Sequence, residues 1–318
     1  MIKTARLSLI TAAAICIATL AAPAPAQQAA APYTVVENGQ GSARLQDAIN
    51  AIGSGSGTIR FAPMRFADCA VQTDGNITYQ AAMAGKAILD GVACEGKAAL
   101  VLRGKSARVE GLVFANIRVR DKNGAGIRLE KGDLVISQSW FRDSEQGLLA
   151  GNDPQASVTI DKSTFTRLGT CEGSGGCAHS IYLGDYGSLS VTRSRFEAGR
   201  GGHYVKSRTE NVEILNSSFD DSAGRATNYM IDLPAGATGQ ISGNWFVQGK
   251  DKENYSAFIA VQAEGRWHTS EGLRIEHNDA RFAPDVSRNS TFVADFSGEA
   301  LVLRGNKLAA GLKRFDRR

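Results

Sequence analysis

Four short segments near the middle of the chain gather histidine, tyrosine, lysine, arginine and aspartate at the alternating spacing of β-strands. They are residues 179–184 (HSIYLG), 203–208 (HYVKSR), 229–234 (YMIDLP) and 257–262 (AFIAVQ). Alternation places every second side chain on the same face of a strand. The aligned apolar residues, which we expect to point inward, are Ile181, Val205, Ile231 and Ile259. The side chains expected to point outward are Ser180, Tyr182, Tyr204, Lys206, Arg208, Met230, Asp232 and Gln262.

The types of these side chains would suit binding an anion and moving a proton. Arg208 carries a guanidinium that can hold a carboxylate through two hydrogen bonds. His203 can accept a proton near neutral pH, and Lys206 can do so if Arg208 and burial under a ligand disfavour its charged form. We take Tyr182, His203 and Lys206 as candidate catalytic residues. The candidate substrate-binding residues are His179, Tyr204, Arg208, Tyr229, Asp232 and Gln262.

A plainer interpretation of the same residues also stands. Lys206 and Asp232 could form a surface ion pair of little energetic weight. His179 and His203 begin their strands, so strict alternation points both inward, as core or turn residues. The glycine-rich stretches 173–176 and 199–202 favour a site, because glycine lets a ligand approach the backbone closely.

A recurring phrase indicates how these strands are positioned. Each copy is six residues long. It begins with an apolar residue, usually has Ser or Asn at the fourth position, and has Phe or Leu at the sixth position in most copies. Neighbouring copies lie 23 to 34 residues apart, which is the period range of solenoids. Stacked copies would lie about 4.8 Å apart and bury their apolar faces against one another. The copies are residues 109–114, 136–141, 160–165, 191–196, 214–219, 241–246, 275–280 and 303–308.

The repeat resembles the rungs of the right-handed parallel β-helix, or pectin-lyase-like, superfamily. Residues 212–219 (VEILNSSF) and 239–246 (GQISGNWF) carry the resemblance, which extends over residues 58 to 310. It implies an all-β parallel solenoid in which Ser and Asn stack as a ladder at a turn and Phe or Leu stack inside. Thirty-five glycines and an irregular period disfavour helical repeats and equal propeller blades.

The ends of the chain give the expected organisation. Residues 1–26 are typical of an export signal, with a charged start, an apolar stretch and a small-residue cleavage site. We expect a lead-in over residues 27–41 and one β-helix domain over residues 42–318. Residues 42–52 predict a short helix that starts at a Ser42 cap, stops at Gly53 and covers the end of the solenoid. The basic tail after residue 312 is expected to be solvated.

Charge and cysteine usage indicate the compartment and the partner class. Without the two basic residues of the signal, 34 basic and 32 acidic residues remain, which disfavours a nucleic-acid partner. No later segment is apolar enough to span a membrane, so we expect a periplasmic or secreted monomer. Cys171 and Cys177 bracket a short loop and favour a local disulfide, which leaves Cys69 with Cys94. A zinc site is the alternative.

One rung also resembles the alginate lyases and chondroitinase B of polysaccharide lyase family six. Residues 206–211 (KSRTEN) resemble a Lys-Ser-x-x-Asn motif, with one extra residue before the Asn. The resemblance implies β-elimination on a uronate polymer, with Lys206 as the base. Arg208 would neutralise the uronate carboxylate, Tyr182 would protonate the leaving oxygen, and His203 is the alternative base. The arginine expected near residues 229–232 and the acids that bind calcium in that family have no match, so no cofactor is assigned.

Other functions remain open at this point. A glycoside hydrolase needs paired carboxylates, which Glu197, Asp220, Asp221 and Asp232 could supply, although the residue order of polygalacturonases is absent. An epimerase and a non-catalytic polysaccharide-binding or surface protein are the further alternatives. Trp267 and His268 could form a sugar-stacking arm or cover the flank of the solenoid.

Overall fold

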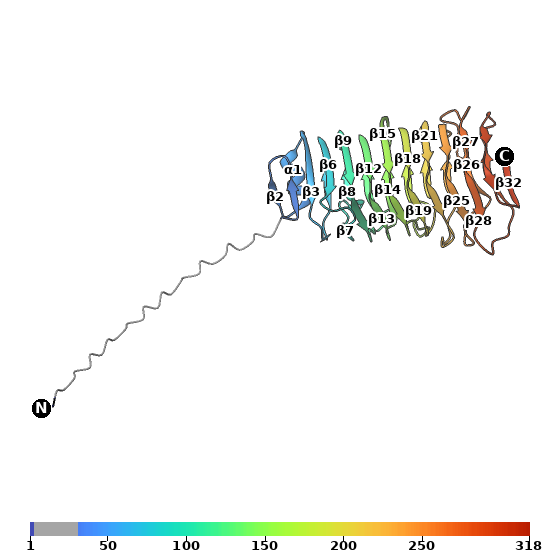
Figure 1. Cartoon of the computed structure of the whole chain (residues 1–318). Helices are drawn as coiled ribbons and strands as arrows, with labels where there is room; N and C mark the ends of the chain where they lie inside the picture. Colours follow the sequence, from blue (N-terminus) through green and yellow to red (C-terminus); the bar gives the residue numbers. More distant parts are fainter. Residues whose placement is uncertain (3–30) are drawn as a thin grey trace. The chain divides into compact units, whose positions relative to one another are not determined.

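The computed structural model of the chain describes residues 1–2 and 31–318. Residues 31–318 form a single compact unit of stacked coils (Figure 1). Apart from its first two residues, the expected signal segment lies outside the described residues. Each full coil passes through three strands, and the equivalent strands of successive coils pair into three long sheets. The all-β solenoid expected from the repeat is confirmed.

Sheet 1 contains the first half of each recurring phrase and has twelve strands. Pairing is parallel except where β1 meets β2 and β3. Its strands in spatial order are β2 (Gln40–Ser42), β1 (Tyr33–Val35), β3 (Ser56–Phe61), β6 (Asn76–Ala81), β9 (Ser106–Glu110), β12 (Asp133–Ser137), β15 (Asp153–Asp161), β18 (Tyr186–Thr192), β21 (Asn211–Leu215), β24 (Thr238–Ser242), β27 (Arg274–Glu276) and β30 (Val302–Arg304).

Sheet 2 contains the second half of each phrase, and all its pairs are parallel. Its strands are β4 (Arg65–Phe66), β7 (Ala87–Asp90), β10 (Leu112–Ala115), β13 (Trp140–Arg142), β16 (Thr164–Thr166), β19 (Arg195–Glu197), β22 (Ser218–Asp220), β25 (Trp245–Gln248), β28 (Asp279–Phe282) and β31 (Lys307–Leu308).

Sheet 3 holds the segments in which chemistry was expected, and it is also parallel throughout. Its last strand pairs the basic tail with the sheet, whereas the lysine and arginine side chains of this tail are exposed to solvent, as expected. The strands are β5 (Ala70–Gln72), β8 (Ala98–Leu102), β11 (Ala125–Leu129), β14 (Gln146–Ala150), β17 (Ile181–Leu183), β20 (Val205–Ser207), β23 (Ile231–Leu233), β26 (Ala257–Val261), β29 (Ser290–Asp295) and β32 (Leu312–Arg317).

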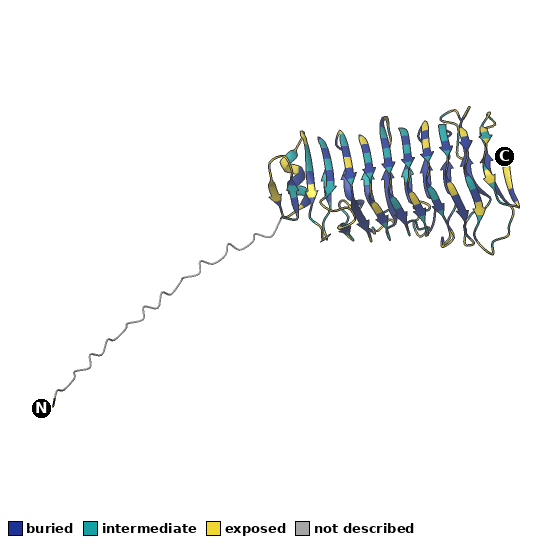
Figure 2. Cartoon of the chain, in the orientation of Figure 1, coloured by how far each residue is buried: buried dark blue, intermediate teal, exposed yellow. Residues whose placement is uncertain are grey.

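Both the expected ladder and the expected aromatic stack are present, the ladder at the turn between sheets 1 and 2. Each ladder side chain after the first accepts a hydrogen bond from the backbone N–H of the ladder residue one coil earlier, at 2.9–3.2 Å. Six phenylalanine rings stack with centroids 4.8–4.9 Å apart. Buried positions recur at the same place on successive strands (Figure 2). The ladder residues are Ser139, Ser163, Ser194, Ser217, Asn244, Asn278 and Asn306, and the stacked rings are Phe114, Phe141, Phe165, Phe196, Phe219 and Phe246.

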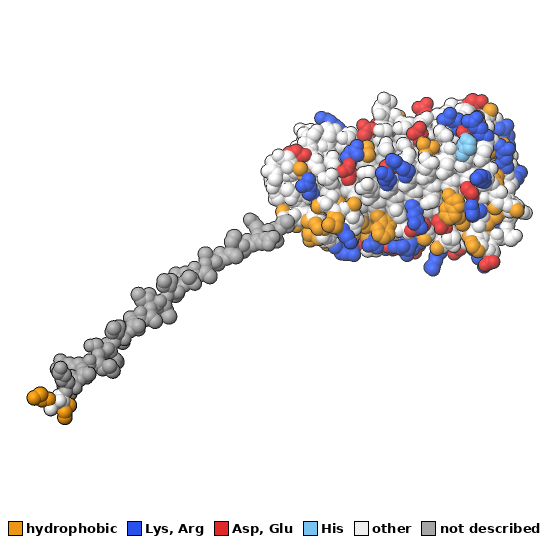
Figure 3. All heavy atoms as spheres, in the orientation of Figure 1, with side chains coloured by type: hydrophobic (Ala, Val, Ile, Leu, Met, Phe, Trp, Pro, Cys, Tyr) orange, Lys and Arg blue, Asp and Glu red, His pale blue; other side chains and the backbone are white. Residues whose placement is uncertain are grey.

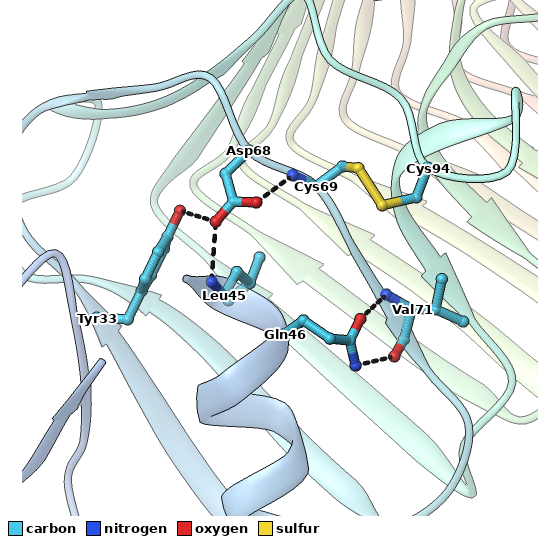
Figure 4. Close-up of a disulfide and its surroundings, with 7 residues drawn as sticks. All are labelled: Tyr33, Leu45, Gln46, Asp68, Cys69, Val71 and Cys94. Carbon is cyan, nitrogen blue, oxygen red and sulfur yellow. Dashed lines mark hydrogen bonds between the residues drawn. A yellow bond between two sulfur atoms is a disulfide. The ribbon is translucent and has the colours of Figure 1, made fainter. Parts of the chain in front are cut away.

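The N-terminal end is covered by helix α1 (Leu45–Ile52), which ends at Gly53 as expected. The expected Ser42 cap is wrong, because that residue belongs to β2. The capping carboxylate instead comes from Asp68, which accepts hydrogen bonds from the Leu45 N–H at 2.8 Å and the Tyr33 hydroxyl at 3.0 Å (Figure 4). Strands β1 and β2 begin before residue 42, so the folded part starts earlier than expected.

Both expected disulfides are present, Cys69–Cys94 beside the N-terminal cap and Cys171–Cys177 in the loop before β17. In the described part of the chain, no helix is long and apolar enough to cross a membrane. Acidic and basic side chains intermingle on the face shown in Figure 3, in agreement with the near-balanced composition.

Candidate functional site

The register of sheet 3 confirms the predicted outward column. Val205 pairs with Ile181 on one side and Ile231 on the other, and all three are fully buried. The same pairing places Lys206 between Tyr182 and Asp232. Because neighbouring parallel strands lie about 4.8 Å apart, these three side chains come from adjacent coils on the outer face of the sheet.

His179 and His203 are turn residues, buried to 8% exposure, and they line a groove, so only the inward direction given by strict alternation is wrong. Both precede the first residue of their strand, where side-chain alternation does not apply. The backbone N–H of His203 donates to Nδ1 of His179 at 3.0 Å, and the two ring centroids lie 5.0 Å apart. Burial, and then the nearby positive charge of Lys206, lowers the pKa of His203 to about 3. Burial likewise holds the pKa of His179 well below 6.5, so both rings are neutral near pH 7.

Two residues that were expected to point outward are in the core. Tyr204 is fully buried, and its hydroxyl donates to Asp221 at 2.7 Å. Met230 is also buried among the apolar side chains. Both lie immediately before β20 and β23, where the chain is still turning, so counting backward from the strand gives the wrong face. Tyr204 is therefore a structural residue, and its assignment to substrate binding is wrong.

Glu264, which the sequence analysis missed, joins the cations of the column. Its Oε1 lies 2.5 Å from Lys206 Nζ, and its Oε2 accepts a hydrogen bond from Arg208. Arg208 also donates to the hydroxyl of Tyr182. Glu264 lies in the loop after β26, 58 residues from Lys206, and no sequence motif marks it.

A buried carboxylate lies beneath the cluster formed by Tyr182, Lys206, Arg208 and Glu264. Asp232 is 3% exposed. Its Oδ2 lies 3.3 Å from Lys206 Nζ and 3.4 Å from His203 Nε2. Burial raises the pKa of Asp232 to about 6 despite the opposing effect of Lys206. For Glu264, partial burial acts upward, but the contacts with Lys206 and Arg208 outweigh it and lower the pKa.

The cluster opens into a groove with a volume of about 780 Å³. Five of the nine predicted site residues line it: His179, Tyr182, His203, Lys206 and Arg208. The groove runs along the outer face of sheet 3 and the amino ends of its strands. Part of its wall is the glycine-rich loop closed by the Cys171–Cys177 disulfide. The other side chains with charged or amide groups that line it are Lys97, Asp121, Asn123, Arg128, Gln146, Asn228, Glu253 and Glu264.

The remaining predicted residues support the groove from outside its lining. The ring of Tyr229 stacks on His203 with centroids 5.5 Å apart. Gln262 is buried, and its side-chain amide donates to the His268 carbonyl at 2.9 Å. Its expected outward, substrate-binding position is therefore wrong, because it fixes the loop that carries Glu264. Within residues 31–318, no group of three or more His, Cys, Asp or Glu side chains is arranged to hold a metal ion.

Comparison with known proteins identifies the architecture. The chain is similar to the ORF18 protein of Geobacillus virus E2, with 14% identity and a TM-score of 0.49, over 86% of this chain and 57% of that one. The chain thus spans little more than half of that neighbour's length. No curated protein matches the sequence. A family model described as "Right handed beta helix region" matches residues 98–280. Because this match covers more than half of the chain, the protein belongs to the right-handed β-helix family.

Proposed function

We propose that this protein is an exported polysaccharide lyase that cleaves a uronate-containing polymer by β-elimination. One observation carries the proposal: Lys206 and Arg208 together hold a carboxylate, that of Glu264, at the groove. A uronate carboxylate presents the same chemistry to the same two cations. The groove in front of them crosses several coils, which suits an extended polymer rather than a compact ligand.

The elimination needs a proton acceptor, and His203 fits this role best. It lines the groove, and burial keeps its ring uncharged near pH 7. Its Nε2 faces Asp232, which would stabilise the imidazolium after proton uptake. Lys206, by contrast, lies between two carboxylates as a hydrogen-bond donor and has no lone pair free in this arrangement.

The other side chains would stabilise charge and complete the reaction. Removal of the proton α to the carboxylate places negative charge on that carboxylate, which Arg208 and Lys206 would neutralise. Loss of the leaving oxygen forms a C=C bond, and the hydroxyl of Tyr182, beside Arg208, would supply the proton to that oxygen. The product is an unsaturated uronate, and no oxidant or reductant is needed.

Ultraviolet absorbance of the conjugated product tests the proposal. The purified protein is incubated with a panel of uronate polymers, such as alginate, polygalacturonate and chondroitin sulfate. Absorbance should rise with at least one polymer, and Arg208→Ala should lower the rate at least a hundredfold. Arg274→Ala, which removes an exposed arginine of β27, is the matched control. Full turnover by Arg208→Ala would refute the carboxylate role, and loss of activity in chelator would indicate calcium.

A glycoside hydrolase is the second candidate, and two carboxylates favour it. Asp232 has a raised pKa and Glu264 a lowered one, and both contact Lys206. Such a split is how paired carboxylates divide the acid and base roles. However, Asp232 is buried beneath Lys206 rather than exposed in the groove. Reducing ends released without ultraviolet absorbance would favour the hydrolase, whereas binding with neither signal would indicate a non-catalytic polysaccharide-binding protein.

Export to the periplasm or beyond is part of the proposal. Two disulfides within the described residues support it, because such bonds persist in oxidising compartments. The apolar leader supports it independently. Fractionation of cells that express the full chain should place the protein outside the cytoplasm, with both cysteine pairs resistant to alkylation until a reductant is added.

A further inference from the structure

A second, smaller pocket adjoins the catalytic cluster on the opposite side from the groove. Its volume is about 300 Å³, and it shares Tyr182, Arg208 and Glu264 with the groove. It lies at the carboxyl ends of sheet-3 strands, whereas the groove extends toward their amino ends. Its other lining residues are Asn152, Gly184, Pro234, Ala235 and Trp267.

Trp267 is the unusual member of this lining, because the residue is 59% exposed. The Arg208 Cζ atom lies 5.8 Å from the centre of its ring. An exposed indole presents a flat apolar face and one N–H, which suits a partner that is apolar on one face and polar at its edges. A pyranose ring has this character.

The backbone around Trp267 is fixed at several points. The N–H groups of Trp267 and His268 both donate to the Ala235 carbonyl at 3.0 Å, and the Glu264 N–H donates to the Pro234 carbonyl at 2.9 Å. The His268 ring also contacts the Arg208 carbonyl at 3.1 Å. A loop whose backbone is fixed before a ligand arrives loses little entropy on binding.

We propose that this smaller pocket is a subsite for a sugar ring, with Trp267 as its stacking platform. The inference rests on the proposed function in one respect: the sugar bound here would adjoin the bond that the cluster acts on. A chain that crosses the cluster would then have its longer part in the 780 Å³ groove and a short end in the 300 Å³ pocket. The ligand class is a uronate-containing oligosaccharide.

The test compares Trp267→Ala with Trp245→Ala. Trp245 is a matched control, because it is 36% exposed and lies 5.8 Å from Arg281 Cζ, but it belongs to sheet 2. Binding of alginate and polygalacturonate oligosaccharides is measured by calorimetry, with neutral dextran as the control ligand. We expect Trp267→Ala to weaken oligosaccharide binding roughly 3- to 10-fold. Trp267→Phe should retain most of the affinity, and Trp245→Ala should change nothing.

Several outcomes separate this inference from the proposed function. Unchanged oligosaccharide affinity in Trp267→Ala would overturn the subsite, even if the wild-type protein produces ultraviolet absorbance. Binding that depends on Trp267 without any absorbance would support the subsite and contradict the lyase. Equal losses in Trp267→Ala and Trp245→Ala would also overturn it, because they would indicate a general effect on the protein.

Discussion

At the scale of single residues, Glu264 determines whether the two cations of the groove are available to an anionic substrate. It is 46% exposed, yet its two oxygens contact two different cations, Lys206 and Arg208. An anionic substrate must therefore displace this carboxylate or share the cations with it. Its exposure makes displacement feasible, because ion pairs open to water are individually weak.

We predict that Glu264→Gln strengthens binding of a uronate oligosaccharide. The amide keeps the shape of the side chain but removes the charge that competes for Arg208 and Lys206, so affinity should rise several-fold. Glu253→Gln is the control, since Glu253 lines the same groove and contacts neither cation. Calorimetric titration at two salt concentrations gives the comparison. Equal gains in both variants would show that net charge alone is responsible.

A second residue-scale prediction concerns His179 and pH. Burial first, and then the proximity of His203 and of the Lys206 cation, keeps its pKa in the folded protein well below 6.5. As the pH falls below 6.5, His179 becomes protonated in the unfolded chain but stays neutral in the folded protein. Stability that is present above pH 6.5 is therefore lost on acidification, by at most about 1.4 kcal/mol per pH unit for one group.

Urea unfolding at pH 7.5, 5.5 and 4.5 measures this loss. The wild-type protein should lose more of its free energy of unfolding between pH 7.5 and 4.5 than His179→Gln does. His277→Gln, which changes an exposed histidine, should follow the wild type. The same pH slope in His179→Gln and the wild type would contradict the assignment of a suppressed histidine.

The alternation of side chains along a strand correctly predicted the outward column of sheet 3, but it gave wrong directions for residues that precede a strand. Tyr182, Lys206 and Asp232 lie within strands, where period two holds. His203 and Tyr204 precede their strand, and their directions follow from the turn rather than from counting. Glu264 could not have been predicted by these means, because a loop after one strand reached a side chain two coils earlier.

At the scale of elements, the N-terminal cap depends on side chains outside the helix. Asp68 precedes β5, yet it supplies the capping acceptor for α1 and also bonds Tyr33. Gln46 in the helix exchanges two hydrogen bonds with the backbone of Val71. The helix itself was predictable from its apolar face, whereas its capping residue was not, because the capping group is 23 residues away.

We predict that Asp68→Ala destabilises this cap. The Leu45 N–H and the Tyr33 hydroxyl would both lose their acceptor, and loss of a helix cap costs about 1–2 kcal/mol. Asp47→Ala is the control, because Asp47 is an exposed acid in the first turn of the same helix. Thermal unfolding should show a lower Tm for Asp68→Ala only. A matching drop in Asp47→Ala would point to the helix dipole rather than to the cap.

For the whole molecule, repetition made the fold predictable and left the site partly unpredictable. One phrase recurs in eight successive coils, so the positions of Asn244, Phe246 and their equivalents follow from stacking alone. Within the sheets each strand pairs only with those of the neighbouring coils, so errors in loop placement do not disturb the sheets. Loops such as 263–268 have no equivalent in other coils, and their packing over the cluster therefore carries no periodic signal.

Because ladder residues bond to those of adjacent coils, we predict that removing an interior ladder side chain destabilises the solenoid more than removing a terminal one. Asn244 is buried and bonds three partners: its Oδ1 accepts from Ser217 N, and its Nδ2 donates to the Ile214 carbonyl and to Asn278.

Asn244→Ala leaves buried backbone groups on the inner side of one coil without partners, at a cost of about 2–4 kcal/mol. Asn306→Ala removes the same side chain at the last, half-buried ladder position and should cost less. Denaturant unfolding followed by circular dichroism compares the two variants. Because strands and ladder residues pair only with those of neighbouring coils, the interior defect should also broaden the transition, whereas the terminal one should not. An equal loss at both positions would mean that the ladder stabilises each coil separately, independent of its place in the stack.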